Sequence, residues 1–224
     1  MPVNSHHPDY DKMLPKWKRC RDASDGQDAV HEAGETYLPR LKDQTDDDYN
    51  AYKLRAGFYG AFWRTISGMV GMVMRIPPVF TVPAAVEPFL QDITLSGIPL
   101  TSFTQSILEE ALEKGRVGVL ADCPPVRATT NGGTPTQADA LAQNVRPTMQ
   151  MYEAESILNW RVERINNVMQ LTLVVLEESE EVVKDEWSSK SEKRWRELSL
   201  VNGVYRQRMW KKDGDVDVQI GEDI

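Results

Sequence analysis

The longest regular pattern of apolar positions runs from Thr45 to Arg75. Apolar or aromatic residues recur there at spacings of three or four, which places them on one face of an α-helix. These residues are Tyr49, Tyr52, Ala56, Tyr59, Trp63, Ile66, Val70 and Val73. Thr45 is a suitable N-cap, three aspartates follow it at the positive end of the helix dipole, and Pro77 ends the pattern. The pattern therefore predicts one long central helix over residues 45–75.

The second half of this predicted helix carries apolar residues on nearly every side. Its four glycines are Gly57, Gly60, Gly68 and Gly71. Each glycine costs about 1 kcal/mol relative to alanine in a helix interior, so the four indicate a bend or the close approach of another backbone. The run from Ala56 to Met74 has nearly the length of a membrane span, but Arg64 lies in its middle, where insertion costs about 2.5–3.5 kcal/mol. We therefore expect a buried helix and no membrane span.

The rest of the chain divides into three regions around this helix. Residues 1–44 are polar and predict an N-terminal helical arm that includes a short basic helix. Residues 45–115 predict a helical part, which ends in an amphipathic helix between an N-cap at Thr101 and a left-handed C-cap at Gly115. Residues 116–224 predict a β-rich part.

The β-rich part shows the alternation of apolar and polar residues that is typical of strands. Candidate strands cover residues 116–122, 148–152, 160–165, 169–176, 195–201, 204–210 and 216–220. Asn202-Gly203 separates two of them and is a strong hairpin signal. Residues 126–145 are rich in Thr, Asn, Gly and Pro and predict a mobile, exposed loop with one helical turn near residues 138–143. The expected fold class is α+β, with the long central helix and shorter helices packed against a mainly antiparallel sheet.

The charge distribution changes this picture more than the overall composition does, because 41% hydrophobic and 27% charged residues are ordinary for a globular protein. A net charge of -8 argues against tight, static binding to duplex nucleic acid. Residues 177–187 carry six acids and one base, whereas residues 188–212 carry eight bases and two acids. Surface patches of opposite sign suggest a partner or a neighbouring copy of the chain; two solvated faces are the simpler alternative.

Catalytic motifs are missing from the sequence, which contains no phosphate-binding loop, dinucleotide fingerprint, HExxH, GxSxG or paired CxxC. The cysteines, Cys20 and Cys123, are too few for a disulfide framework and indicate a reducing compartment; with no secretory signal, we expect a cytoplasmic product. Cys123 with His31 could act as nucleophile and base, although a small buried cysteine is the simpler interpretation. We expect no enzyme and no cofactor.

Two candidate metal sites are also weak. The three aspartates at residues 46–48 could bind a divalent ion, but an acidic first turn of a helix explains them better. His6-His7 could be half of a metal site, yet no third ligand lies nearby in the sequence. We therefore expect no metal.

Arginines and tryptophans interleave along the predicted strands, around Trp160, Trp187, Trp195 and Trp210. This combination is found on nucleic-acid platforms and also at subunit interfaces. The candidate interface or DNA-facing residues are Arg194, Arg196, Arg206, Arg208, Lys211 and Lys212. The net acidity of the chain favours the subunit interface.

Four segments in this order resemble the N-terminal half of the portal protein family of tailed bacteriophages, over about residues 8–210. They read YKLRAGFYGAFWRTISGMVGMVMRIPP, LEEALEKGRVGVLADCPP, RPTMQMYEAESILNWRVERINNVMQLTLVVLEE and RWRELSLVNGVYRQRMW. The most similar group is a portal-like one of unknown function. The resemblance implies a wing region, with the long helix and the β-rich part.

The family resemblance implies a homo-oligomeric ring, usually of twelve subunits, at one vertex of the capsid. The genome is packaged through such a ring by a terminase and later ejected, so capsid, terminase and head-tail adaptor proteins and transient double-stranded DNA are the implied partners. The implied location is the virion, and the host cytoplasm during assembly. Family portals are longer, and we expect this chain to continue into a C-terminal stem and clip. The alternative is a stand-alone adaptor or nucleic-acid-binding module that uses the basic hairpin 194–212.

Overall fold

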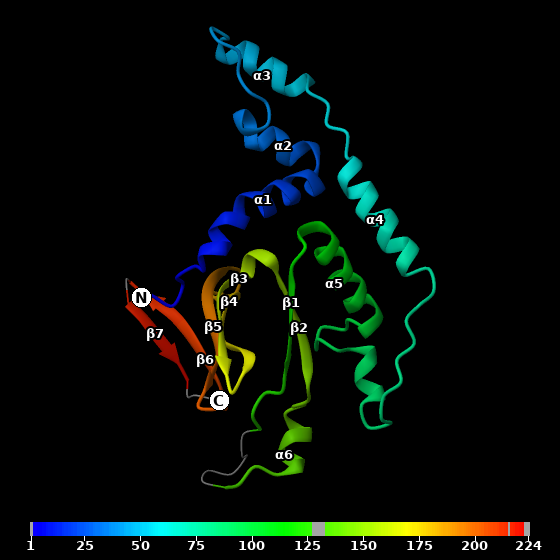
Figure 1. The fold of residues 1–224 in the computed structure, drawn as a ribbon, viewed down its shortest axis with the longest axis vertical. Coiled ribbons are helices and arrows are strands. Elements are labelled where there is room, and N and C mark those ends of the chain that lie inside the picture. Colours follow the sequence, from blue (N-terminus) through cyan, green and yellow to red (C-terminus); the bar gives the residue numbers. More distant parts are fainter. Residues whose placement is uncertain (1, 127–132, 215, 222–224) are drawn as a thin grey trace.

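The computed structural model describes residues 2–126, 133–214 and 216–221, which adopt an α+β fold (Figure 1). The α-helices are α1 (Pro8–Asp25), α2 (Gln27–Ala33), α3 (Asp46–Arg55), α4 (Ala61–Val73), α5 (Leu100–Lys114) and α6 (Gln137–Ala142). Short 3-10 helices are η1 (Gly34–Thr36), η2 (Glu87–Gln91) and η3 (Ala154–Ser156). The strands are β1 (Val117–Asp122), β2 (Thr148–Glu153), β3 (Ile157–Ile165), β4 (Val168–Val183), β5 (Ser189–Val201), β6 (Val204–Asp213) and β7 (Val216–Ile220). The predicted fold class is confirmed.

The prediction of one long helix over residues 45–75 is wrong in its central part. The chain forms α3 and α4, separated by residues 56–60 in a non-helical conformation (Figure 1). Gly57 and Gly60 lower the helix propensity of this segment. In addition, two side chains from α2 contact backbone groups of the segment. The carbonyl oxygen of Ala56 lies 2.7 Å from His31 Nε2, and the amide of Phe58 donates to Gln27 Oε1 at 3.3 Å. The apolar spacing continues across the break, so periodicity alone did not reveal it.

Helix α4 is also less buried than its sequence predicts. Only Ile66 and Val70 are buried, whereas Trp63 and Met69 are each 41% exposed and Met72 is 71% exposed. Gly68 and Gly71, which indicated the close approach of another backbone, have no atom within 4 Å of the position a Cβ would take. An apolar helix therefore lies at the surface of the single chain.

Two of the three predicted caps at other helix ends are present in the structure. Thr45 Oγ1 accepts a hydrogen bond from the amide of Asp48 and caps α3, and Gly115 ends α5 with a φ of 72°. Helix α5 begins at Leu100 after Pro99, so Thr101 is not its N-cap. The helical turn expected within 126–145 is α6, while residues 127–132 of that predicted loop lie outside the described residues.

All described strand pairs are antiparallel and belong to two sheets. Strands β1 and β2 form a two-stranded sheet, and β3 to β7 follow one another in a five-stranded meander. The hairpin between β5 and β6 turns at Asn202-Gly203, where both residues have positive φ, as the Asn-Gly signal predicts. The mainly antiparallel sheet is thereby confirmed.

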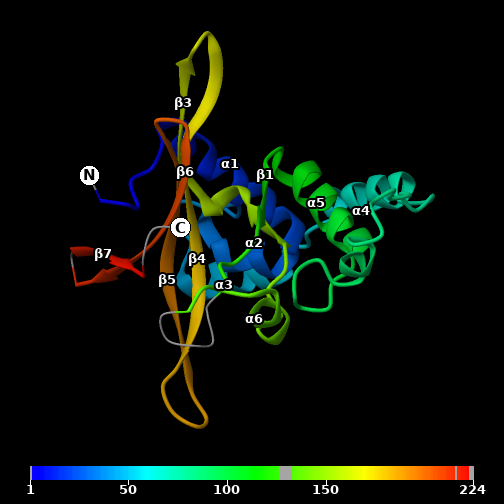
Figure 2. The same cartoon turned by 90° about the horizontal axis from the view of Figure 1, so that it is seen from below.

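Two hairpins of the meander project at opposite ends of the sheet (Figure 2). One is the turn between β3 and β4. The other is formed by the long strands β4 and β5, where residues 179–183 pair with residues 189–193 and with no other described strand. We call residues 183–189 the hairpin tip. A two-stranded ribbon without a third strand or a covering helix has little support of its own.

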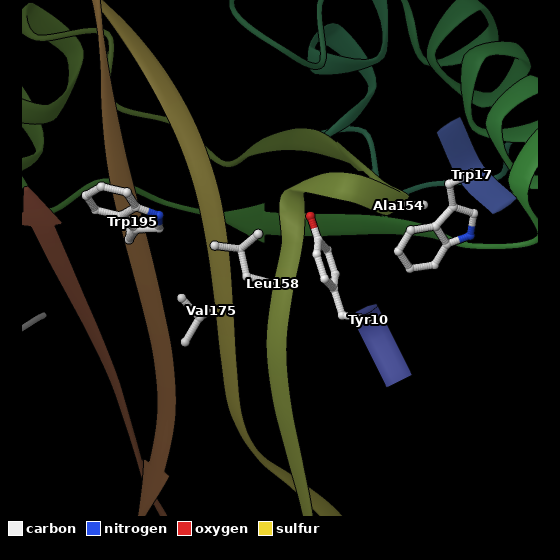
Figure 3. Close-up of a cluster of buried hydrophobic side chains, with 6 residues drawn as sticks. All are labelled: Tyr10, Trp17, Ala154, Leu158, Val175 and Trp195. Atoms are coloured by element: carbon white, nitrogen blue, oxygen red, sulfur yellow. The ribbon is translucent and has the colours of Figure 1, made fainter. Parts of the chain in front are cut away.

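The main core lies between the start of α1 and the five-stranded sheet. Tyr10 and Trp17 from α1 pack with Ala154, Leu158, Val175 and Trp195 (Figure 3). The Tyr10 hydroxyl donates to the carbonyl of Glu155 at 2.9 Å, and Trp17 Nε1 donates to the carbonyl of Lys114 at 3.2 Å. A second, smaller cluster of Tyr152, Ile157 and Leu176 joins the two sheets. Helix α1 is therefore part of the core of the β-rich region.

Candidate interaction surface

The oppositely charged segments 177–187 and 188–212 lie next to each other in the fold. Antiparallel pairing of β4 and β5 brings acids and bases together on neighbouring strands. Lys193 Nζ lies 2.7 Å from Glu177, and Arg194 forms an ion pair with Glu180. The two patches proposed from the sequence are thus largely neutralised within one hairpin, because diagonal cross-strand neighbours are within reach of long side chains.

The six basic candidate residues are divided between the two faces of the sheet. Arg194 is the register partner of Lys211, so these two share a face with Arg196. Arg206, Arg208 and Lys212 lie on the other face, since successive side chains of a strand point to opposite sides. The fold therefore does not bring these residues into one basic patch.

Three of the six candidates already have acidic partners. Besides Arg194, Arg196 contacts Glu178 at 2.6 Å and Asp122 at 3.2 Å, and Arg208 Nη2 donates to Glu197 at 2.6 Å. The other three, Arg206, Lys211 and Lys212, form no ion pair with any residue that the structure describes. A continuous track of free cations for phosphates is not assembled on this hairpin.

The four tryptophans have different surroundings rather than a shared platform. Trp195 is buried in the core, Trp210 Nε1 donates to Glu197 at 2.9 Å, and Trp160 stacks with the ring of His7 at 4.0 Å. Trp187 alone among these four is almost fully exposed, at 89%, and it lies in the hairpin tip. It is the one of them available for contact with a partner.

The weak chemical candidates do not form reactive sites among the described residues. His31, in α2, lies 2.7 Å from the Ala56 carbonyl oxygen, whereas Cys123 follows β1 at a distant part of the molecule, so these two residues do not form a nucleophile and base pair (Figure 1). Cys123 is exposed, so the interpretation of a small buried cysteine is wrong. His7 Nδ1 caps α1 by accepting from the Asp9 amide, and His6 pairs with Asp11 at 2.9 Å. The acidic turn at residues 46–48 follows the Thr45 cap, as the simpler interpretation expected.

No protein-family model matches the chain, and no curated protein is significantly similar to it.

An apolar groove of about 690 Å³ lies between the two sheets and α1. Its lining comprises Asp9, Met13, Trp17, Lys114, Gly115, Arg116, Gly118, Val119, Leu120, Tyr152, Ile157, Trp160, Leu171, Val174, Leu176 and Leu198. Val119 is 46% exposed and Leu171 is 55% exposed, so the groove is open to solvent on that side.

Arg116 supplies the positive charge of the groove. Its guanidinium carbon lies 3.9 Å from the ring centre of Trp160 and 5.6 Å from that of Trp17. Burial lowers the pKa of this guanidinium, and no acid among the described residues forms an ion pair with it. Asp9 also lines the groove, but its carboxylate pairs with Lys12 at 2.8 Å. Cation–π contacts thus hold a guanidinium whose charge is not neutralised by a carboxylate.

A charge cluster with buried Lys114 and Glu110 at its centre adjoins the groove, between α1, α5 and η3. The Lys114 ammonium, on a fully buried side chain, lies 2.7 Å from Glu155 and 3.3 Å from Glu110. Arg21 contacts Glu153 at 2.6 Å, and the Ala154 amide donates to Glu110 at 3.0 Å. Burial raises the pKa of Glu110 to about 7.

The three glutamates of this cluster have oxygens close enough together to suit a metal ion. Lys114 and Arg21 contact the same carboxylates, however, and supply positive charge there. The cluster therefore acts as an internal salt-bridge network that joins three elements.

A second polar network attaches β1 to the five-stranded sheet. Arg196 bridges Asp122 and Glu178, while Tyr152 donates its hydroxyl to Glu178 and Gln207 donates to Asp122 at 3.3 Å. Burial, followed by the hydrogen bond to Glu178, raises the pKa of the Tyr152 hydroxyl. Arg196, a candidate surface residue in the sequence, is thus a partly buried structural link between β1 and the five-stranded sheet.

Sequence reasoning missed the groove and Arg116. The groove residues come from α1, α5 and the strands β1 to β5, and no spacing along the chain connects them. Gly118 was the available signal, because a Cβ there would lie 3.0 Å from Ile157 Cδ1.

Among the described helices, none has the length and apolar character needed to span a membrane.

Proposed function

We propose that the chain is a structural subunit of a phage portal-type ring, located at the capsid vertex of the virion and without catalytic activity or a cofactor. The observation that carries the proposal is helix α4, an apolar helix of which only Ile66 and Val70 are buried in the single chain. Apolar helical surfaces of this kind are covered in an assembly. The resemblance to portal proteins supplies the kind of assembly, a ring that is expected to hold twelve copies.

The charge arrangement supports the same proposal. Bases of the hairpin 194–212 are divided between two faces and half of the six candidates have acidic partners. A wall along which DNA moves during packaging and ejection must not grip phosphates, since each tight contact would oppose the movement. Weak, transient contact with double-stranded DNA is therefore part of the proposal, together with terminase, capsid and head-tail adaptor proteins as partners.

The decisive experiment measures the mass and symmetry of the assembly, using native mass spectrometry and electron microscopy on the full gene product. The assembly is then titrated with duplex DNA at two salt concentrations. We expect a closed ring with weak DNA affinity. A monomer that binds DNA tightly would overturn the proposal in favour of a nucleic-acid-binding module, provided that its steep salt dependence is lost in the triple variant Arg206→Ala, Lys211→Ala, Lys212→Ala.

The enzyme alternative has its own test. A phage-associated hydrolase that used Cys123 would lose activity on ester or peptide substrates in Cys123→Ala, while Cys20→Ala would serve as the matched control. We expect no turnover by the wild-type chain. Turnover that Cys123→Ala abolishes and Cys20→Ala retains would contradict the structural role.

A further inference from the structure

The hairpin tip has the features of an insertion element. Trp187 and Val183 are 89% and 74% exposed, and the ribbon that carries them projects beyond the other strands (Figure 2). Exposed aromatic side chains of this size bury about 150–250 Å² when they enter a pocket, and tryptophan is a frequent anchor at interfaces. The tip is therefore better suited to contact with a partner than to the isolated chain.

The tip is internally braced around Trp187. The Asp185 carboxylate accepts hydrogen bonds from the amides of Trp187 and Ser188 at 3.0 and 2.9 Å. Glu186, which lies between Asp185 and Trp187 in the sequence, forms no ion pair or hydrogen bond with any described residue. The tip thus presents an indole beside an unneutralised carboxylate.

The groove presents the complementary pair of features. It is apolar, it is open beside Val119 and Leu171, and Arg116 supplies a cation that lacks an acidic partner among the described residues. We propose that the hairpin tip of a second copy docks in this groove, with the Trp187 indole against its apolar wall and Glu186 facing Arg116. This inference rests on the proposed ring and specifies one contact between its subunits.

The hairpin tip cannot enter the groove of its own chain without disrupting the pairing of β4 with β5. Leu176 lines the groove and Val183 begins the tip on the same strand, β4. Val183 is seven residue steps along the extended strand from Leu176, roughly 24 Å at 3.4 Å per residue. Tip and groove are different surfaces, so a contact between copies is head-to-tail, and a head-to-tail contact generates a ring when its rotation closes.

The test uses a photo-crosslinking residue. p-Benzoylphenylalanine is placed at position 187 of the full gene product, and the crosslinked peptides of the assembly are mapped. We expect intermolecular crosslinks to the groove, on residues 116–120 or 171–176. Crosslinks confined to other surfaces, such as α4, in an assembly that is otherwise a ring would overturn the docking and leave the proposed ring in place. A wild-type chain that stays monomeric at all concentrations would overturn both.

A charge exchange provides the second arm. Arg116→Glu and Glu186→Arg are each expected to weaken self-association at least tenfold, and the double variant is expected to restore most of it. Leu41→Ala, which removes an exposed apolar side chain away from tip and groove, is the control and should leave association unchanged. Single variants that keep the wild-type melting temperature and still assemble like wild type would contradict the contact between Glu186 and Arg116.

Discussion

At the scale of residues, the internal charges are more informative than the surface charges. Arg194, Arg196 and Arg208 were candidate interface or DNA-facing residues in the sequence, but cross-strand carboxylates neutralise them in the fold. Glu110 and Lys114 drew no attention in the sequence because i and i+4 pairs are common on helix surfaces. Both are buried here, and burial makes their charges matter for stability.

Lys114→Met is expected to destabilise the protein strongly. The substitution keeps the apolar stem but removes the ammonium that contacts Glu155 and Glu110. The buried Glu110 and the partly buried Glu155 then lack one of their positively charged partners. Breaking a buried pair in this way costs about 3–5 kcal/mol. Urea unfolding measures the loss. Lys12→Met, at an exposed pair with Asp9, is the control and should leave the unfolding curve close to that of wild type.

Glu110 gives the protein a defined pH dependence. Its carboxyl has a folded-state pKa of about 7, above the ordinary value of 4.5, so the folded state holds a proton that the unfolded state has lost between these pH values. The contribution of this group to stability is therefore full below pH 4.5 and decreases as the pH rises to 7. Glu110→Gln removes this titration. Between pH 5 and pH 8, the unfolding free energy of wild type should therefore decrease more than that of the Glu110→Gln variant. The two decreases should differ by up to about 3 kcal/mol.

Chemical denaturation at a series of pH values checks this difference. Glu32→Gln, at an exposed glutamate, is the matched control and should follow the wild-type curve. Parallel curves for wild type and Glu110→Gln would show that the Glu110 carboxyl does not titrate in this range.

At the scale of elements, local sequence signals set the caps and the hairpin turn, whereas tertiary contacts set the break between α3 and α4. The Thr45 cap, the Gly115 cap and the Asn202-Gly203 turn depend on a few neighbouring residues, and the structure has all three. The break between α3 and α4 depends on His31 and Gln27, which are distant along the chain, and the sequence pattern could not show it. Local rules are reliable where the hydrogen-bond partners are local.

Deletion of residues 129–139 tests the loop assignment at this scale. The predicted loop 126–145 contains α6, which has no buried residue, and residues 127–132 lie outside the described part. Shortening an exposed connection changes loop-closure entropy by less than about 1 kcal/mol. The deletion variant is therefore expected to melt within a few degrees of wild type in differential scanning calorimetry. A large drop in melting temperature would show that the segment packs against the fold.

At the scale of the whole molecule, the exposed apolar surface is the unusual feature. Met72 on α4 and Trp187 in the hairpin tip lie at separate places and belong to separate elements. Two such surfaces on one chain fit a subunit that contacts neighbours on more than one side. The proposal of a ring gives both surfaces a partner.

The Met72→Lys variant tests whether α4 contributes to the contact between subunits. Because Met72 is 71% exposed in the single chain, the melting temperature of the isolated subunit should be nearly unchanged. A charge placed in a contact between subunits should shift the assembly towards monomers, which sedimentation velocity detects. Leu41→Lys, an equally exposed apolar position outside α4, is the control. If the Met72→Lys variant still forms the full-size assembly, α4 is not part of the interface between subunits.

The sequence by itself determined the fold class, most strands, the caps at Thr45 and Gly115 and the main hairpin turn, because periodicity and turn chemistry act over a few residues. Only the tertiary structure decided which charges are neutralised, where the long helix breaks and which residues form the groove. The physical reason is that ion pairs such as Arg196 with Asp122, and the contact of Arg116 with Trp160, join residues far apart in the chain. Their distances are set by strand register and by the packing of α1, β1 and the five-stranded sheet, which no local pattern contains.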